Sequence, residues 1–304
     1  MRITTTMLFT QGLAGLQAAL DRFARAQRQA ATGARLAAPS DDPEAAARAT
    51  RATARLAALR QWQRQAADAT DLLTMVDDTL GRVGEVMARA HELALQGASD
   101  TQGPVQRQAM AAEVDVLLDT VVAAINERLD RRQLFGGRQS TTPPLLVTRD
   151  AQGRITGAAW GPDVTGPVTV QVDDATTVDL AVPGPQAFGA DAAPDFLPGV
   201  LIQLRDALAA DDGAAVRALL PQLESATDRL DLARIDVGAR LGRLDGLRRS
   251  LTDRTTDAES FRSTLLDADL ARAAIDVSQS QLAYQAALGA LRATQGLSLV
   301  DVLR

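Results

Sequence analysis

The chain has 304 residues, of which 46% are hydrophobic and only 3% aromatic, and its formal net charge is -6. Its apolar residues are mostly Ala, Leu and Val, which favours long, thin helix bundles over a wide core. The negative charge offers no basic face to a nucleic acid. The absence of cysteine excludes disulfides, thiol nucleophiles and thiolate metal sites.

The N-terminal segment predicts a coiled-coil helix that ends near Thr32 and Gly33. Its seam positions step alternately by four and three residues, the spacing of a helix that packs against a partner. They are Phe9, Leu13, Leu16, Leu20, Phe23, Gln27 and Ala30. After a loop, Asp42, Pro43 and Glu44 supply the N-cap, the first-turn proline and the acidic residue typical of a helix start.

The second helix is predicted to form a long rod with a regular seam. The seam consists of Leu59, Trp62, Ala66, Ala69, Leu73, Val76, Leu80, Val83, Met87, Ala90 and Ala94. Residues 97–103 predict a turn, and Pro104 opens a third helix that is predicted to run to Leu134.

Prolines and glycines crowd between residues 138 and 194, where short β-type runs cover residues 144–148, 168–172 and 176–182. This texture predicts a small β-rich inserted domain. Helical signals resume around Gly213, with a seam that continues to Leu244. The polar residues 252–257 are expected to separate this helix from the C-terminal segment.

The C-terminal segment carries a second apolar ladder, which a lone helix cannot bury. The ladder consists of Phe261, Leu265, Ala268, Ile275, Leu282, Ala286 and Leu288. The predicted fold is therefore mainly α, a long antiparallel coiled-coil bundle formed by the N- and C-terminal parts, with the β-rich domain inserted. Its expected divisions are an N-terminal assembly helix and loop (1–42), two rod parts (43–137 and 196–256), the inserted domain (138–195) and a C-terminal assembly helix (257–304).

The sequence offers no active site, metal site or cofactor-binding motif. His91 is the only histidine and Leu95 stands where a zinc-protease helix requires a second one. Asp41 and Asp42 are expected in a capped loop, and Asp267 and Asp269 on a solvated helix face. No apolar run is long enough to predict a membrane span. The first residues lack a secretory signal, which alone would favour a cytoplasmic protein.

Several ordered motifs resemble the flagellin family. Residues 32–46, T-G-A-R-L-A-A-P-S-D-D-P-E-A-A, resemble the signature near the start of these proteins. Residues 92–98, E-L-A-L-Q-G-A, and the closing L-S-L-V-D-V-L resemble two further family segments. The form P-S-D-D-P, the L-F-G-G at residues 134–137 and the closing segment favour the branch that joins hook to filament over filament flagellin.

The resemblance implies a structural subunit of the bacterial flagellum that forms an adaptor ring between hook and filament. It also implies type III export without a cleaved signal peptide, and therefore an extracellular location. The implied partners are further copies of the chain, the preceding hook-associated protein, flagellin and a cytoplasmic export chaperone.

Two sets of contact residues follow from the apolar stripes and the resemblance. Assembly contacts are expected at Phe9, Leu13, Leu16, Leu20, Arg35, Pro39, Asp41, Asp42, Pro43, Leu282, Leu288, Leu297 and Leu299. The chaperone is expected to bind Leu270, Val277, Tyr284, Leu288 and Leu291. Two alternatives stay open: filament flagellin itself, which a separate and more abundant flagellin in the same cell would exclude, and a cytoplasmic coiled-coil adaptor, which export would exclude.

Overall fold

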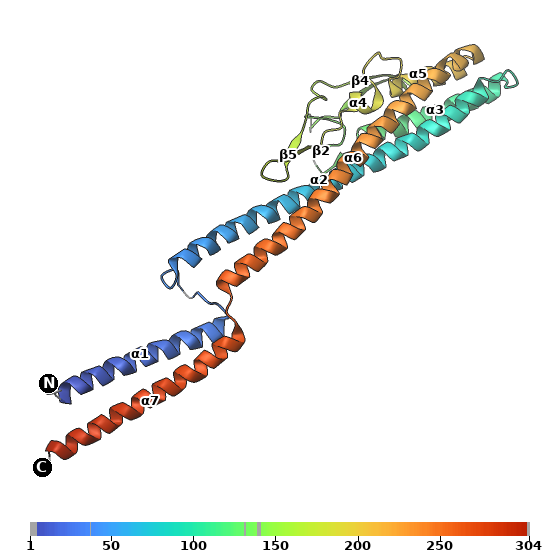
Figure 1. Cartoon of the computed structure of the whole chain (residues 1–304). Coiled ribbons are helices and arrows are strands. Elements are labelled where there is room, and N and C mark those ends of the chain that lie inside the picture. The colour runs from blue at the N-terminus through green and yellow to red at the C-terminus, as the bar shows by residue number, and fades with distance from the viewer. Residues whose placement is uncertain (1–4, 37, 131, 139–140, 303–304) are drawn as a thin grey trace. The chain divides into compact units, whose positions relative to one another are not determined.

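The computed structural model describes residues 5–36, 38–130, 132–138 and 141–302, apart from the side chains of residues 5–6, 8–9 and 294–302. Its helices are α1 (Thr5–Thr32), α2 (Pro43–Gly97), α3 (Pro104–Ile125), α4 (Gly184–Phe188), α5 (Leu197–Ala209), α6 (Gly213–Leu266) and α7 (Leu270–Val302) (Figure 1). The strands are β1 (Arg128–Leu129), β2 (Arg132–Gln133), β3 (Leu145–Arg149), β4 (Ile155–Trp160), β5 (Thr169–Gln171) and β6 (Thr177–Asp179). The prediction of a mainly α chain with a small β-rich region is confirmed.

The chain folds into two compact units. The first comprises Met1–Ala58 and Asp253–Arg304, and the second comprises Leu59–Thr252. Helices α2 and α6 therefore each contribute one segment to both units.

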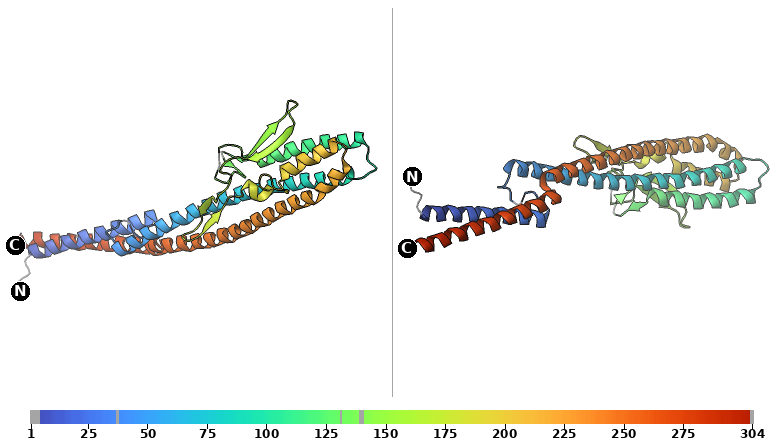
Figure 2. Two further views of the ribbon diagram at one scale, coloured as in Figure 1. Left: turned by 90° about the horizontal axis from the view of Figure 1, so that it is seen from above. Right: turned by 60° about the horizontal axis from the view of Figure 1, so that its bottom comes forward.

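The core of the second unit is built on the two seams that the sequence predicts. All eleven seam positions of α2 from Leu59 to Ala94 are buried. On α6 the seam is buried from Val216 to Val237 and again at Leu244, while Leu241 is half-buried. In this unit α2, α3, α5 and α6 run side by side (Figure 2). Apolar positions that recur every three or four residues thus face one continuous core.

A buried arginine forms hydrogen bonds to the turn after α2 and to the turn before α6, at one end of this bundle. Arg107 on α3 donates from Nε to the Gly97 carbonyl over 2.8 Å and from Nη2 to the Ser99 carbonyl over 2.9 Å. Its Nη1 reaches Asp211 Oδ1 at 2.5 Å. One guanidinium therefore satisfies carbonyls that the end of α2 leaves without helical partners.

The β-rich region consists of hairpins that pack on the same bundle. β3 and β4 are antiparallel, with Leu145 opposite Trp160, and β5 pairs with β6. Phe135 and Phe188 meet edge to face with ring centroids 4.9 Å apart. This aromatic cluster gives the region a core of its own against α5.

Helix α3 ends nine residues before the predicted Leu134, so that prediction is wrong. Asn126 caps the helix, and its side-chain amide exchanges two hydrogen bonds of 3.0 Å with the backbone of Leu145. The chain then turns at Asp130, where φ is 54°, to form the β1–β2 hairpin. The amide contact lies far along the chain, so local periodicity does not show it.

The boundary between the two units, between Thr252 and Asp253, falls within the expected separation at residues 252–257, yet α6 runs through these residues without a break and continues to Leu266. Thr252 is accommodated in the helix by donating its hydroxyl to the Arg248 carbonyl over 2.9 Å. The break follows α6 instead, and Asp269 there accepts hydrogen bonds from the amides of Ala271 and Arg272 at 2.9 and 3.2 Å. Asp267 and Asp269 thus occupy a capped break and not a helix face.

Candidate functional site: an assembly surface

In the first unit α1 and α7 form an antiparallel pair, with both chain ends at the same end of the pair (Figures 1 and 2). Phe23 stacks on Tyr284 with ring centroids 6.3 Å apart and planes inclined by 9°. Gly12 lies so near α7 that a Cβ on it would be 2.9 Å from Leu291 Cδ1. One face of each helix is therefore covered by the other, as the two apolar stripes predict.

The opposite faces of the pair carry large apolar side chains that the chain itself does not cover. Leu282 is 70% exposed and Ile275 56%, while Leu20 on α1 is 45% exposed. Between Leu270 and Ala293 the only charged residues of α7 are Arg272, Asp276 and Arg292. A helix that is apolar on both sides belongs in a buried position, so this surface requires a further partner.

The structure divides the predicted terminal contact residues between these two faces. Leu16 and Leu288 are half-buried within the α1–α7 pair, whereas Leu13, Leu20 and Leu282 remain exposed. The side chains of Phe9, Leu297 and Leu299 lie outside the described residues.

The predicted chaperone stripe lies mostly on the face of α7 that α1 covers. Val277, Tyr284, Leu288 and Leu291 are half-buried, and Tyr284 and Leu291 contact α1 directly. Leu270 is the exception, with 62% of its surface exposed. A chaperone that used this stripe would therefore occupy the place of α1.

Hydrogen bonds within the loop explain several residues of the motif between α1 and α2. Gly33 ends α1 with φ at 66°, a conformation that favours glycine. Asp41 Oδ2 accepts from the Ala38 amide at 2.9 Å, and Asp42 Oδ1 caps α2 by accepting from the Ala45 amide at 2.9 Å. Pro43 is the first residue of α2, as predicted.

Arg35 contacts the end of α6 across the break that precedes α7. Its guanidinium donates to the Leu265 carbonyl from Nε at 3.1 Å and from Nη2 at 2.9 Å. Its backbone amide donates to the Leu266 carbonyl at 2.7 Å. These contacts are intramolecular, whereas the sequence led us to expect Arg35 at a contact between subunits.

The same loop forms one wall of an apolar groove of about 550 Å³. Leu36, Ala38 and Pro39 lie on the loop side, and Leu266 comes from the end of α6. The other wall is a face of α2 made of small side chains, namely Ala46, Ala49, Thr50, Thr53, Ala54 and Ala57. Pro39 is exposed here, where another polypeptide can reach it.

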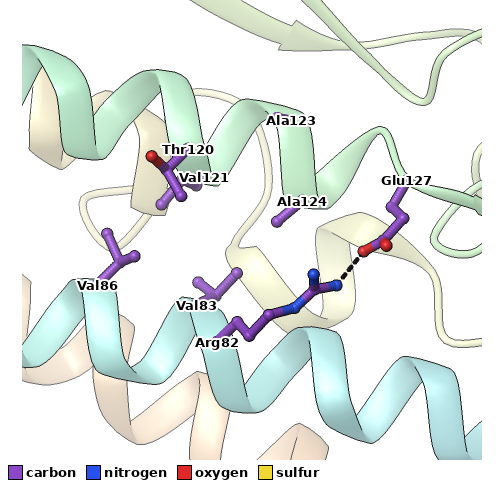
Figure 3. A pocket seen from close by; sticks show the side chains of 8 residues that line it. All are labelled: Arg82, Val83, Val86, Thr120, Val121, Ala123, Ala124 and Glu127. Carbon is purple, nitrogen blue, oxygen red and sulfur yellow. Dashed lines mark hydrogen bonds and ion pairs between the residues drawn. The ribbon is translucent and has the colours of Figure 1, made fainter.

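The second unit has a hollow of about 280 Å³ between α2 and α3 (Figure 3). Valine and alanine side chains from both helices line it, and the ion pair of Arg82 with Glu127 closes one end. Thr79 Oγ1 also donates to Glu127 Oε2 at 3.0 Å. The pair joins α2 to the turn that follows α3. The other residues that line the hollow are Val, Ala and Thr, which add no group for acid–base chemistry.

Among the described residues, no group of three or more His, Asp or Glu side chains is placed to hold a metal ion. In that same part of the chain, no helix combines the length and the apolar character that crossing a membrane requires.

Comparisons with known proteins find that the chain is similar to flagellar proteins. Residues 3–138 match the family model described as the bacterial flagellin N-terminal helical region. Flagellar hook-associated protein 3 of Salmonella typhimurium is 24% identical over 326 residues, covering 100% of both chains. The protein of the same name from Escherichia coli K12 is 25% identical over 324 residues, covering 99% of both.

A solved structure shares the fold. The putative flagellar hook-associated protein from Vibrio parahaemolyticus superimposes with a TM-score of 0.64 at 19% identity. The match covers 75% of this chain and 100% of that one.

Proposed function

We propose that this chain, whose resemblance to the flagellin family and to hook-associated protein 3 is confirmed, is a structural subunit that joins the flagellar hook to the filament. The observation that carries the proposal is the uncovered apolar face of the α1–α7 pair. Leu20, Ile275 and Leu282 expose apolar surface of the kind that subunit interfaces bury.

In this function the chain acts by shape and contact and not by catalysis. Copies of it form a ring, with one axial side on the preceding hook-associated protein and the other on flagellin. Flagellar tubes grow by repeated contacts between subunits that do not close on themselves, so a junction subunit has to present different surfaces above and below. The chain reaches this extracellular position by type III export.

Deleting the gene tests the proposal. We expect the deletion strain to keep its hooks and to release flagellin into the medium, because export continues while the first filament layer has no junction ring on which to assemble. Electron microscopy of the cells and a blot of the medium measure both effects, and returning the full chain should restore filaments.

Matched leucine variants test the surface itself. Leu282→Asp should fail to restore filaments, because it places a charge in an apolar interface. Leu146→Asp makes the same change at a leucine on β3, in the second unit, that is 50% exposed, and it should restore them. If both variants restored filaments equally well, the exposed α1–α7 surface would not be a subunit contact.

The same strains separate the alternatives. Normal filaments in the deletion strain would exclude a junction subunit. Long filaments composed mainly of this chain would identify it as filament flagellin, and retention in the cytoplasm would favour the coiled-coil adaptor.

A further inference from the structure

We propose that Arg35 is a positioning residue that holds the start of α7 in register with the end of α1. The effect of Arg35 on assembly rests on the proposed function, whereas its effect on the register of the two helices does not. The structure places Arg35 where two helix breaks lie side by side in the first unit: residues 33–35, directly after α1, and residues 267–269, between α6 and α7.

The guanidinium satisfies groups that the end of α6 leaves without partners. The last carbonyls of a helix have no intrahelical donor, and a cation there also complements the helix dipole. Two donors of the Arg35 fork converge on the Leu265 carbonyl, at 3.1 and 2.9 Å, and the backbone amide reaches the Leu266 carbonyl at 2.7 Å. A lysine at this position could offer only a single ammonium group.

Backbone groups of residues 33–34 also contact the break between α6 and α7. The Ala268 amide donates to the Gly33 carbonyl at 2.8 Å, and Ala34 forms an antiparallel bridge with Asp267. The two hydrogen bonds flank this bridge, so Ala34 and Asp267 form the closely spaced, non-hydrogen-bonded kind of pair.

This contact fixes where α7 begins relative to α1. Asp269 caps α7 directly after the bridge, so the helix starts at a position set by residues 33–35. A slip of one residue would rotate the faces of α7 by about 100°. Such a rotation would move Tyr284 away from Phe23 and turn Leu282 away from the outer face of the pair.

Hydrogen exchange tests the structural part on the full chain. In Arg35→Ala we expect the amides of Ala268 and Ala271 to exchange about tenfold faster or more, because a charged hydrogen bond across the break is lost. Arg28→Ala removes an exposed arginine from the same end of α1 and should leave these rates unchanged. Arg35→Lys should fall between the two, and unchanged exchange in Arg35→Ala would overturn the proposal.

A cysteine pair tests whether Arg35 acts by positioning α7 or by contacting a neighbouring subunit. The chain has no cysteine of its own, and a narrow antiparallel pair has Cα atoms about 4.5 Å apart, within the range for a disulfide. The double substitution Ala34→Cys and Asp267→Cys therefore replaces the clamp covalently.

In the deletion strain, Arg35→Ala should restore at least about tenfold fewer filaments than the original chain. Adding the oxidised cysteine pair to Arg35→Ala should bring filaments back, and a reducing agent should abolish them. Either single cysteine should rescue nothing. Failure of the oxidised pair to rescue would mean that Arg35 contacts another subunit, which overturns the proposal. If the original chain also restores no filaments, the proposed function fails while the exchange rates still decide the role of Arg35.

Discussion

Leu80 and Leu95 lie on the same helix of the second unit but in opposite environments. Leu80 is fully buried, whereas Leu95 is 53% exposed. We expect Leu80→Asp to lower the free energy of unfolding by several kcal/mol, about 3 or more, because it buries an unpaired charge. Leu95→Asp makes the identical change and should cost less than about 1 kcal/mol. Chemical denaturation compares them, and equal losses would contradict the assigned seam.

Arg205 gives a second comparison at single residues. It is buried, and its Nη1 donates to Asp115 Oδ1 at 2.8 Å and to the Ile155 carbonyl at 2.6 Å. Burial alone would lower the pKa of this guanidinium, but hydrogen bonds to Asp115 and Asp206 outweigh it and hold the pKa above its usual value. The group therefore stays charged within the fold.

We expect Arg205→Leu to cost about 2–4 kcal/mol, because it leaves Asp115 and a buried carbonyl without their donor. Arg249→Leu removes an exposed helical ion pair with Asp245 and should cost about 0.5 kcal/mol or less. Thermal unfolding of both variants measures the difference. A similar loss in both would show that the Arg205 network contributes no more than a surface pair.

At the scale of helices, the α1–α7 pair has one covered side and the second unit has a filled core. We therefore expect the pair to open more readily than the second unit in a purified monomer. Trypsin should cleave first after the exposed arginines of the pair, Arg22, Arg25, Arg28, Arg272 and Arg292. Limited proteolysis with mass spectrometry identifies the cuts, and protection of these sites in a verified monomer would contradict this expectation.

The sequence predicts helices well where an apolar period is long and unbroken. The α2 seam and the start of α2 at Pro43 agree with the structure because spacing and capping are local properties. The end of α3 was predicted wrongly, and the helical continuity of α6 through residues 252–257 was not predicted. Asn126 stops α3 through a contact with Leu145, and Thr252 stays helical through a bond to its own turn. α5 lies within the predicted rod part 196–256 but not within its predicted seam, and it is held partly by Arg205 contacts to distant residues.

At the candidate assembly surface, the sequence indicated which side chains are apolar but not which face each one occupies. Leu16 and Leu20 belong to one predicted stripe, yet the first is half-buried and the second is exposed. The difference depends on the register of α1 against α7. Arg35 contributes to that register through residues far away in the chain, and periodicity within one helix contains no such information.

At the scale of the whole molecule, the β-rich region belongs to the second unit and is joined to the helices there by buried contacts. Leu145 and Ile155 are almost fully buried, and Phe188 is completely so. Replacing residues 138–194 by a short linker should therefore lower the melting temperature by about 5 °C or more. Shortening only the exposed turn at residues 151–153 should shift it by less than about 2 °C. Calorimetry distinguishes these outcomes, and an unchanged melting temperature after the full excision would show that the region is an independent appendage.

The covered face of α7 sets up a competition for any chaperone that binds there. Because α1 is tethered to the same chain, it acts on Tyr284 and Leu291 at an effective concentration of about a millimolar, typical of linked segments. The proposed chaperone therefore has to bind α7 tightly enough to displace α1 at that effective concentration. Removing residues 1–32 should therefore tighten chaperone binding, which calorimetric titration of the two forms can measure. If the truncated chain bound no more tightly than the full one, the chaperone would be using a different face. If the truncated chain binds more tightly, α1, the helix that completes the assembled subunit, is also the segment that displaces the chaperone.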